Sequence, residues 1–359
     1  METLLEYKCP CCNGALTFHS GLQKMKCPYC DTELDVQTLK QMDADLKDAP
    51  PDDMTWENSA GTDWQEGEQE GLRSYECRSC GGQIVTDATT SATACPYCGN
   101  PVVMAQQVSG ILRPDCLIPF KLDKKAAEAA LKRHLQGKPL LPKAFKDENH
   151  IKEVKGVYVP FWLFDSHARG NARYHATRTR MWSDSRYNYT QTSHFSIHRD
   201  GYMDFAAVPV DGASKMDNTL MESLEPYDLS QAVPFQTAYL AGYYADKYDV
   251  EAKDCAPRAN ERIRSSMEGA LRRTVMGYAT VVPEHCSVQL SKSTSRYALY
   301  PVWLLSTRYK GENYLFAMNG QTGKLVGDLP MDWGAFWKWW GLVAAGVSAL
   351  ACLVYWFLL

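Results

Sequence analysis

The sequence lacks an excess of basic residues. Its 38 Lys and Arg stand against 42 Asp and Glu, which gives a formal net charge of -4 and a pI near 6.1. Proteins that neutralise nucleic-acid phosphates need clustered Lys and Arg. The first 36 residues do carry Lys8, Lys24 and Lys26, but residues 73–104 carry few cations. We therefore expect no nucleic-acid partner.

Familiar catalytic motifs are missing as well. The chain contains no H-E-x-x-H, no G-x-S-x-G and no nucleotide-binding fingerprint. The run Met318-Asn-Gly-Gln-Thr-Gly-Lys lacks the spacing of a phosphate loop, and its Asn319-Gly320 pair predicts a hairpin turn instead. These absences favour a protein that is not an enzyme.

One enzymatic alternative stays open, because four histidines gather between residues 167 and 198. His194 and His198 would share a strand face, and with a nearby Asp they would make a metal or acid–base site. Histidines on an exposed sheet are more often hydrogen-bonded surface groups. The set comprises His167, His175, His194 and His198.

A secretory signal is also missing, since the first residues do not lead from a basic segment into an apolar run. The C-terminus, in contrast, is apolar: residues 339–359 read WWGLVAAGVSALACLVYWFLL without one charge. At about 1.5 Å per residue this run covers the roughly 30 Å of a hydrocarbon core. We predict a single transmembrane helix over 333–359 that acts as a tail anchor and leaves the N-terminal bulk in the cytoplasm. The alternative is a buried core helix.

Aromatic residues stand at both ends of this predicted span, where amphipathic rings meet the two membrane interfaces. Small residues at i,i+4 within the span favour helix association, so a homo- or hetero-oligomer is expected. The aromatic residues are Trp333, Trp337, Trp339, Trp340, Tyr355 and Trp356, and the small ones are Gly341, Ala344, Ala345 and Ser348.

Thirteen cysteines are present, and eight of them form two clusters with the same spacing. Each cluster has two C-x-x-C pairs separated by fourteen residues, and a shift of 68 residues superimposes one cluster on the other. Cys11 falls opposite Ser79, which makes Cys12 the ligand. Four thiolates at this spacing are typical of zinc ribbons. The predicted ligands are Cys9, Cys12, Cys27 and Cys30 in the first cluster and Cys77, Cys80, Cys95 and Cys98 in the second.

The two predicted sites hold one Zn²⁺ each, and four thiolates leave no open position, so a structural role is favoured over a catalytic one. Gly81 and Gly99 follow the second cysteine of each pair in the second cluster, where the turn favours a left-handed backbone. The first cluster has Asn13 and Asp31 at these positions. A rubredoxin-like iron site remains an alternative because its knuckles have the same sequence.

Residues 37–72, between the clusters, predict an acidic linker. From 41 to 72 there are ten Asp or Glu against Lys47, which is typical of a solvated segment. Trp56 and Trp64 are unusual in such a segment. They either pack back on the ribbons or form a short motif for a partner.

Residues 105–331 predict an α+β domain that is rich in antiparallel sheet. A helix is expected from the N-cap Asp123 to Gly137, and a longer one from about Pro257. The longer helix has an apolar stripe flanked by arginines, which indicates a solvated face or, alternatively, contact with anionic lipid or an acidic partner. The stripe is Ile263, Met267, Leu271 and Val275.

Strand signals dominate the rest of this region. Residues 156–164 form a β-branched and aromatic run, and residues 173–205 alternate polar with apolar residues. An offset of 141 suggests an internal repeat of two hairpins. It aligns Pro160, Trp162, Leu163, Gly170 and Ala176 with Pro301, Trp303, Leu304, Gly311 and Ala317.

The predicted organisation is thus an α+β multidomain chain. It has zinc ribbons at 1–36 and 73–104, a linker at 37–72, an α+β domain at 105–331 and an anchor at 333–359. A resemblance to a known family rests on the order of these parts, the Cys-Pro-Tyr-Cys knuckles, the Pro-x-Trp hairpins, and the sequence segments from Leu224 to Leu229 and from Ala238 to Tyr243. The chain resembles bacterial TFIIB-type zinc-ribbon membrane proteins. That family is often mislabelled as replication-restart helicases.

The resemblance implies a membrane anchor that works beside phage shock protein A in the response to envelope stress. The expected function is a non-enzymatic, tail-anchored adaptor that recruits partner proteins, such as a membrane-associated scaffold or a second anchor protein. Two alternatives remain: a nucleic-acid-binding ribbon protein held at the membrane, and a metal-dependent enzyme that uses His194 and His198.

Overall fold

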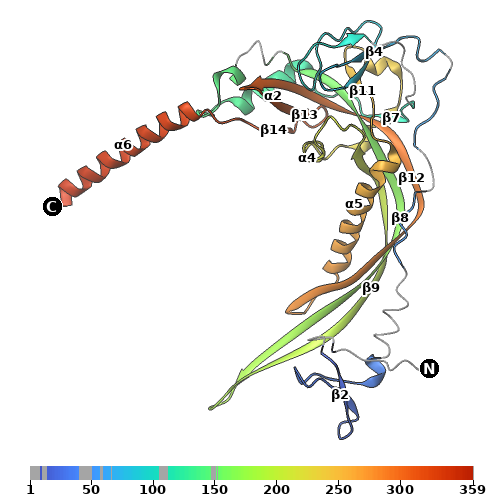
Figure 1. The fold of residues 1–359 in the computed structure, drawn as a ribbon, viewed down its shortest axis with the longest axis vertical. Coiled ribbons are helices and arrows are strands. Elements are labelled where there is room, and N and C mark those ends of the chain that lie inside the picture. The colour runs from blue at the N-terminus through green and yellow to red at the C-terminus, as the bar shows by residue number, and fades with distance from the viewer. Residues whose placement is uncertain are drawn as a thin grey trace. The chain divides into compact units, whose positions relative to one another are not determined.

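The computed structural model describes residues 9, 14–39, 51–56, 60–65, 67–104, 112–146, 151 and 153–358 (Figure 1). The chain divides into two compact units. Unit 1 comprises Met1–Asn58, Phe164–Val208 and Ala256–Thr294, and unit 2 comprises Ser59–Leu163, Pro209–Cys255 and Ser295–Leu359. Each unit contains one cysteine cluster, and the region predicted as one α+β domain contributes residues to both.

The fold is a mixed α+β arrangement. The α-helices whose bounds lie within the described residues are α2 (Lys124–Leu135), α4 (Asn218–Ser223), α5 (Ala252–Arg273) and α6 (Trp333–Leu358). The strands are β1 (Thr17–His19), β2 (Lys24–Lys26), β3 (Glu33–Leu34), β4 (Leu72–Glu76), β5 (Gln83–Asp87), β6 (Val103–Met104), β7 (Cys116–Leu117), β8 (Lys155–Ser183), β9 (Asn188–Asp211), β10 (Val233–Pro234), β11 (Tyr244–Asp246), β12 (Thr280–Tyr309), β13 (Glu312–Asn319) and β14 (Leu325–Gly327).

A small antiparallel sheet of unit 1 consists of β1, β2 and β3 in that order. Its strands have two or three residues each and are mostly exposed. The core beneath them is correspondingly small. It contains Cys9, Leu16, Cys27 and Leu39, with Met25 and Leu34 packed against it.

The large sheet is mixed, so the prediction of an antiparallel sheet is only partly right. Its order is β10-β7-β12-β8-β11-β5-β4-β6, with β9 on β8, β13 on β12 and β14 on β13. β12 pairs with β7 in parallel, and β11 pairs with β8 in parallel. Within unit 2, β11 pairs antiparallel with β5, so the strands of the second cysteine region continue into the large sheet.

The strands β8, β9 and β12 are unusually long, at 29, 24 and 30 residues (Figure 1). Residues 156–164 of β8 are all buried, which is why this stretch is continuously apolar and aromatic. After Phe164 the pattern alternates, and from residue 178 to the end of β8 every residue is exposed. The predicted strand segments 156–164 and 173–205 therefore lie in β8 and β9.

Helix α5 packs its apolar stripe into the core of unit 1, as the i+4 pattern predicts. Ile263, Met267, Leu271 and the following Val275 are all buried against the Ala-rich face of β8. The helix begins at Ala252 rather than near Pro257, so Pro257 lies inside the helix beyond its first turn, where its nitrogen cannot donate to the carbonyl four residues earlier. Gly170 permits this packing, since a Cβ there would lie 2.5 Å from Met267 Cγ.

Helix α2 matches its prediction closely. The Asp123 side chain caps it by accepting from Ala126 N at 2.8 Å, and Gly137 follows its end with a positive φ of 72°. Its buried face of Ala127, Leu131 and Leu135 joins a core of unit 2 that also contains Trp303 and Phe316.

The predicted repeat of two hairpins is wrong in its first copy. β12 turns at Lys310 and Gly311 into β13, but β8 continues through Gly170 to Ser183 without a turn. The two tryptophans of the repeat do have similar roles in unit 2. Each is buried and donates its indole N–H to a backbone carbonyl: Trp162 to Val250 at 2.8 Å and Trp303 to Leu122 at 3.0 Å.

The acidic segment is not simply solvated in the part that the structure describes. In unit 1, Trp56 stacks edge-on against Phe164, at 4.7 Å between ring centroids, and donates to Asn260 Oδ1 at 2.9 Å. In unit 2, Trp64 lies edge-on to Phe235 at 5.7 Å. The sequence left two alternatives, packing on the ribbons or a motif for a partner, and neither describes these contacts with Phe164 and Phe235.

Helix α6 is the one helix among the described residues that is long and apolar enough to cross a membrane. The qualifying segment, Trp333–Phe357, has a mean hydropathy of 1.8 and no buried residue in its most apolar part. The alternative of a buried core helix is therefore wrong. Asp332 caps the helix by accepting from Gly334 N and Ala335 N, and its own N–H donates to Leu140 O at 2.8 Å.

Candidate metal centres

The four cysteines of the second cluster converge in unit 2. The sulfur-to-sulfur distance is 3.5 Å between Cys77 and Cys98 and 3.6 Å between Cys80 and Cys95. All four sulfurs lie within 4.8 Å of one another. Four thiolates placed tetrahedrally at about 2.3 Å from zinc stand about 3.8 Å apart. The group therefore has the size needed to hold a metal ion.

Two tight turns bring these cysteines together. Cys77 N donates to Gly82 O at 2.9 Å, and Gly81 N donates to Cys77 O at 2.7 Å. The turn from Cys95 repeats this pattern with Asn100 O and Gly99 N. Gly81 and Gly99 both have φ of 72°, so the predicted left-handed positions are confirmed.

The thiols of this group do not ionise alike. Burial opposes the charge on Cys77, but the backbone N–H groups of Cys80 and Ser79 outweigh it and lower the pKa of Cys77 to about 7. Burial raises the pKa of Cys80 to about 11, and it raises the pKa of Cys95 further. The backbone donors thus favour the thiolate form at Cys77, and a bound cation would favour ionisation of all four thiols.

The first cluster repeats this geometry as far as the structure describes it. Cys9, Cys27 and Cys30 have sulfurs within 4.8 Å of one another, and the Cys9 and Cys30 sulfurs are 3.6 Å apart. Cys27 N donates to Thr32 O at 2.9 Å, and Asp31 N donates to Cys27 O at 3.0 Å. Asp31 has a positive φ of 56°, as its alignment with Gly99 predicts. Cys12 and Asn13 lie outside the described residues.

Comparison with known proteins places the chain in a family. The Bacillus subtilis (strain 168) protein named "Uncharacterized protein YdjG" is 34% identical over 330 residues, which cover 78% of this chain and 97% of that protein. The chain belongs to the YdjG family. No protein-family model and no solved structure matches it.

In this member of the YdjG family, the histidines do not converge as the enzymatic alternative requires. His194 Nδ1 lies 3.0 Å from His175 Nε2 with the rings stacked, and His167 hydrogen-bonds Asp204. Among the described residues, the two cysteine groups are the only sets of three or more His, Cys, Asp or Glu with ligand atoms this close. The geometry gives no support to a metal site built on His194 and His198.

The exposed end of the β8–β9 hairpin is a feature that the sequence analysis missed. We name it the aromatic tip: Arg180, Met181, Trp182, Arg186, Tyr187 and Tyr189. Trp182 stacks on Tyr189 at 5.4 Å, and Arg180 lies 5.6 Å above the Trp182 ring. The run R-M-W-S-D-S-R-Y-N-Y has a hairpin pattern, but only the structure shows that these rings face solvent.

Charge at the aromatic tip is positive. The single acid within it, Asp184, accepts from Arg186 N at 2.8 Å, Tyr187 N at 2.7 Å and the Tyr189 hydroxyl at 2.8 Å. These donors lower the pKa of Asp184, so the carboxylate stays charged, and its one negative charge stands against the two positive charges of Arg180 and Arg186. Arg180 and Arg186 therefore give the exposed surface of the tip its positive charge.

Proposed function

We propose that this protein is a non-enzymatic membrane adaptor: α6 anchors it in a bacterial membrane, and the two metal centres and the α+β body recruit a partner protein on the cytosolic face. The observation that carries the proposal is α6, whose most apolar stretch is entirely exposed and whose ends bear tryptophan and tyrosine. An apolar helix of 25 residues matches a bilayer in length.

The metal in each centre is proposed to be Zn²⁺ with a structural role. Thiolates at tetrahedral spacing suit zinc, and a closed set of four sulfurs leaves no position for a substrate or water. Each ion would hold two knuckle turns together and make the surface around them rigid. Iron in the rubredoxin manner is the alternative that metal analysis distinguishes.

The partner is proposed to be phage shock protein A or a related scaffold, as the resemblance of the sequence implies. The aromatic tip supports docking of an acidic protein surface, because Trp, Tyr and Arg dominate interaction hot spots and the tip has two outward arginines. Trp182 is 44% exposed and Tyr187 is 65% exposed, although both are large and partly apolar.

Purified full-length protein in phosphatidylcholine vesicles would test this proposal by flotation with phage shock protein A from the same organism. Uncharged bilayers keep binding of the scaffold to lipid low. We expect the scaffold to float with the protein, and Trp182→Ser with Tyr187→Ser to reduce the bound fraction about tenfold or more, as for loss of two hot-spot residues.

Tyr202→Ser is the matched control, because Tyr202 lies on the same hairpin and is 64% exposed, and it should bind like the wild type. Equal flotation by the tip variant would show that the partner docks elsewhere. If the scaffold floats no better with the protein than with empty vesicles, the assignment of this partner is wrong.

A further inference from the structure

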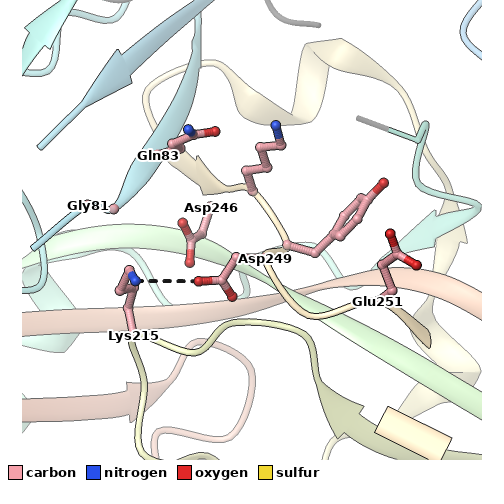
Figure 2. Close-up of a pocket in the computed structure, with 9 residues that line it drawn as sticks. Gly81, Gln83, Lys215, Asp246, Asp249 and Glu251 are labelled. Carbon is pink, nitrogen blue, oxygen red and sulfur yellow. Dashed lines mark ion pairs between the residues drawn. The ribbon is translucent and has the colours of Figure 1, made fainter. Parts of the chain in front are cut away.

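A polar pocket in unit 2 lies beside the second metal centre (Figure 2). Its volume is about 410 Å³, which falls within the range of small-molecule sites. Three segments line it: the turn at Gly81–Gln83 directly after Cys80, Lys215 after the end of β9, and residues 246–251 at the end of β11 and beyond. The proposed adaptor role assigns nothing to this pocket.

Asp246 is the unusual residue in the pocket. Only 4% of it is exposed, and among the described residues its Oδ2 has no hydrogen-bond partner. The strand fixes its position, since Asp246 pairs with Ile84 and Lys247 N donates to Gln83 O at 3.1 Å. Figure 2 shows its carboxylate beside that of Asp249, inside the pocket. A buried acceptor without a donor is costly unless a ligand supplies one.

The surrounding groups do not supply that donor. Burial raises the pKa of Asp246 to about 7; the Tyr97 hydroxyl opposes this rise, and the charge of Asp249 adds to it. Yet the Tyr97 hydroxyl is itself without a hydrogen bond among the described residues, so the two groups approach without completing one. The carboxyl and the hydroxyl therefore remain two unsatisfied groups on one side of the second metal centre.

The other charges of the pocket are mostly matched. Asp249 accepts from Ser214 N at 2.6 Å and lies 3.6 Å from Lys215 Nζ, and Glu251 pairs with Lys253 at 2.8 Å. Lys247 also lines the pocket, and the structure gives no ion pair for it within the described residues. What remains is one buried carboxyl group and one lysine, which together complement a ligand with both charges.

A divalent metal ion fits the pocket poorly. The carboxylates of Asp246, Asp249 and Glu251 do not form a set of converging ligand atoms, since only the cysteine groups do so among the described residues. Two lysines also line the pocket and would repel a doubly charged ion. A primary ammonium group needs only a few acceptors and carries a single charge.

We propose that this pocket binds a small zwitterionic primary amine, with its ammonium group donating to Asp246 and its phosphate or carboxylate group near Lys247. The binding would satisfy the Asp246 oxygen that the protein leaves without a donor.

Isothermal titration of the full chain in detergent micelles would test the site with three compounds. Phosphoethanolamine has an ammonium and a phosphate group, β-alanine has an ammonium and a carboxylate group, and phosphocholine has a cation without N–H donors. We expect phosphoethanolamine or β-alanine to bind, and their relative affinity identifies the anionic group. Phosphocholine should bind about tenfold or more weakly, because it cannot donate to Asp246.

Asp246→Asn should weaken binding of the better amine about 10- to 100-fold, as expected for loss of a charge-assisted hydrogen bond. Lys247→Gln should weaken it less. Asp328→Asn, an exposed change in the same unit, is the matched control and should have no effect. If Asp246→Asn does not fold, the discrimination against phosphocholine by the wild type tests the same contact. Absence of binding by both amines, or equal binding of phosphocholine, would overturn the proposal.

Discussion

The two cysteine centres have the same local turns but different support. The second centre lies on β4 and β5, which continue into the large sheet of unit 2 through β11, and Tyr97 between its last two cysteines is fully buried. The first centre has only the short strands β1 to β3 and a small core around Leu16 and Leu39. The duplicated sequence thus occurs in two structural contexts, and we expect a bound metal ion to contribute a larger share of the stability in the first.

Removal of metal should produce the largest difference in stability between the two centres. Structural zinc supplies about 10–16 kcal/mol in isolated ribbon peptides. We expect a chelator to unfold β1–β3, so that their amides exchange with solvent at once, while β5 retains protection through its pairing with β11. Hydrogen exchange with mass spectrometry on the full chain in detergent measures both regions together.

Cys27→Ser and Cys95→Ser are the genetic counterparts of this experiment. Each should lower the zinc content from two ions to one per chain, but only Cys27→Ser should abolish protection of the strands around its own site. If both ribbons lose protection equally, the sheet does not support the second centre and the contrast between them is wrong.

A smaller effect is expected where the chain after the first centre is tied to the body of unit 1. Asp52 accepts from Val288 N at 2.8 Å and pairs with Arg264 at 2.5 Å. Burial opposes its charge, but these two partners outweigh burial and lower the pKa of Asp52. Asp52→Asn should therefore increase exchange of the Val288 amide about fivefold near pH 7, which corresponds to about 1 kcal/mol for a partly exposed pair.

The pH dependence of this difference follows from the lowered pKa. The stabilisation is fully present above the unfolded pKa of about 3.9 and disappears as the pH falls through the lower folded value. The wild type and Asp52→Asn should therefore differ by a constant factor from pH 8 to pH 5 and converge at more acidic pH. Asp53→Asn is the control, because Asp53 accepts from Thr55 within its own segment. A difference that grows on acidification would contradict the pairing.

An effect of similar size concerns the left-handed position of the knuckles. Asp31 has φ of 56° where the second centre has Gly99 at 72°. A left-handed backbone costs a non-glycine residue about 1 kcal/mol. Asp31→Gly should slow release of zinc from the first centre, and Gly99→Ala should speed release from the second, each about fivefold.

The rate of zinc transfer to a coloured chelator measures this effect. The variant Asp31→Asn distinguishes the effect of backbone conformation from the effect of side-chain charge. That variant removes the exposed ion pair with Lys26, which contributes little, and keeps a residue type that tolerates left-handed geometry. If Asp31→Asn and Asp31→Gly behave alike, charge rather than backbone conformation controls the release.

Local features were predictable because each depends on a few neighbouring residues. The cap at Asp123, the stripe from Ile263 to Val275 and the left-handed turn at Asp31 follow from side-chain chemistry and helix or turn geometry. The apolar run of α6 is equally local. The cysteine pairs with fourteen-residue spacing also predicted the convergence of sulfurs that the structure shows for the described cysteines.

Features that depend on distant packing were not predictable. The repeat predicted that Gly170 precedes a turn, but Gly170 lies within β8, where the absence of a side chain leaves room for Met267. Only the position of α5 explains this glycine. For Trp56 and Trp64 the sequence left packing on the ribbons and a motif for a partner open, because their ring partners Phe164 and Phe235 lie more than a hundred residues away. The isolation of Asp246 likewise arises from β11 pairing with β5, which no local pattern encodes.

The junction at Asp332 has a mechanical consequence. The residue that caps α6 also donates its N–H to Leu140 O, so the first turn of the apolar helix is bonded on one side to the loop after α2. In a bilayer, a change in thickness alters the tilt of a spanning helix. A change in tilt would therefore load the Asp332–Leu140 hydrogen bond, which joins the start of α6 to the loop after α2.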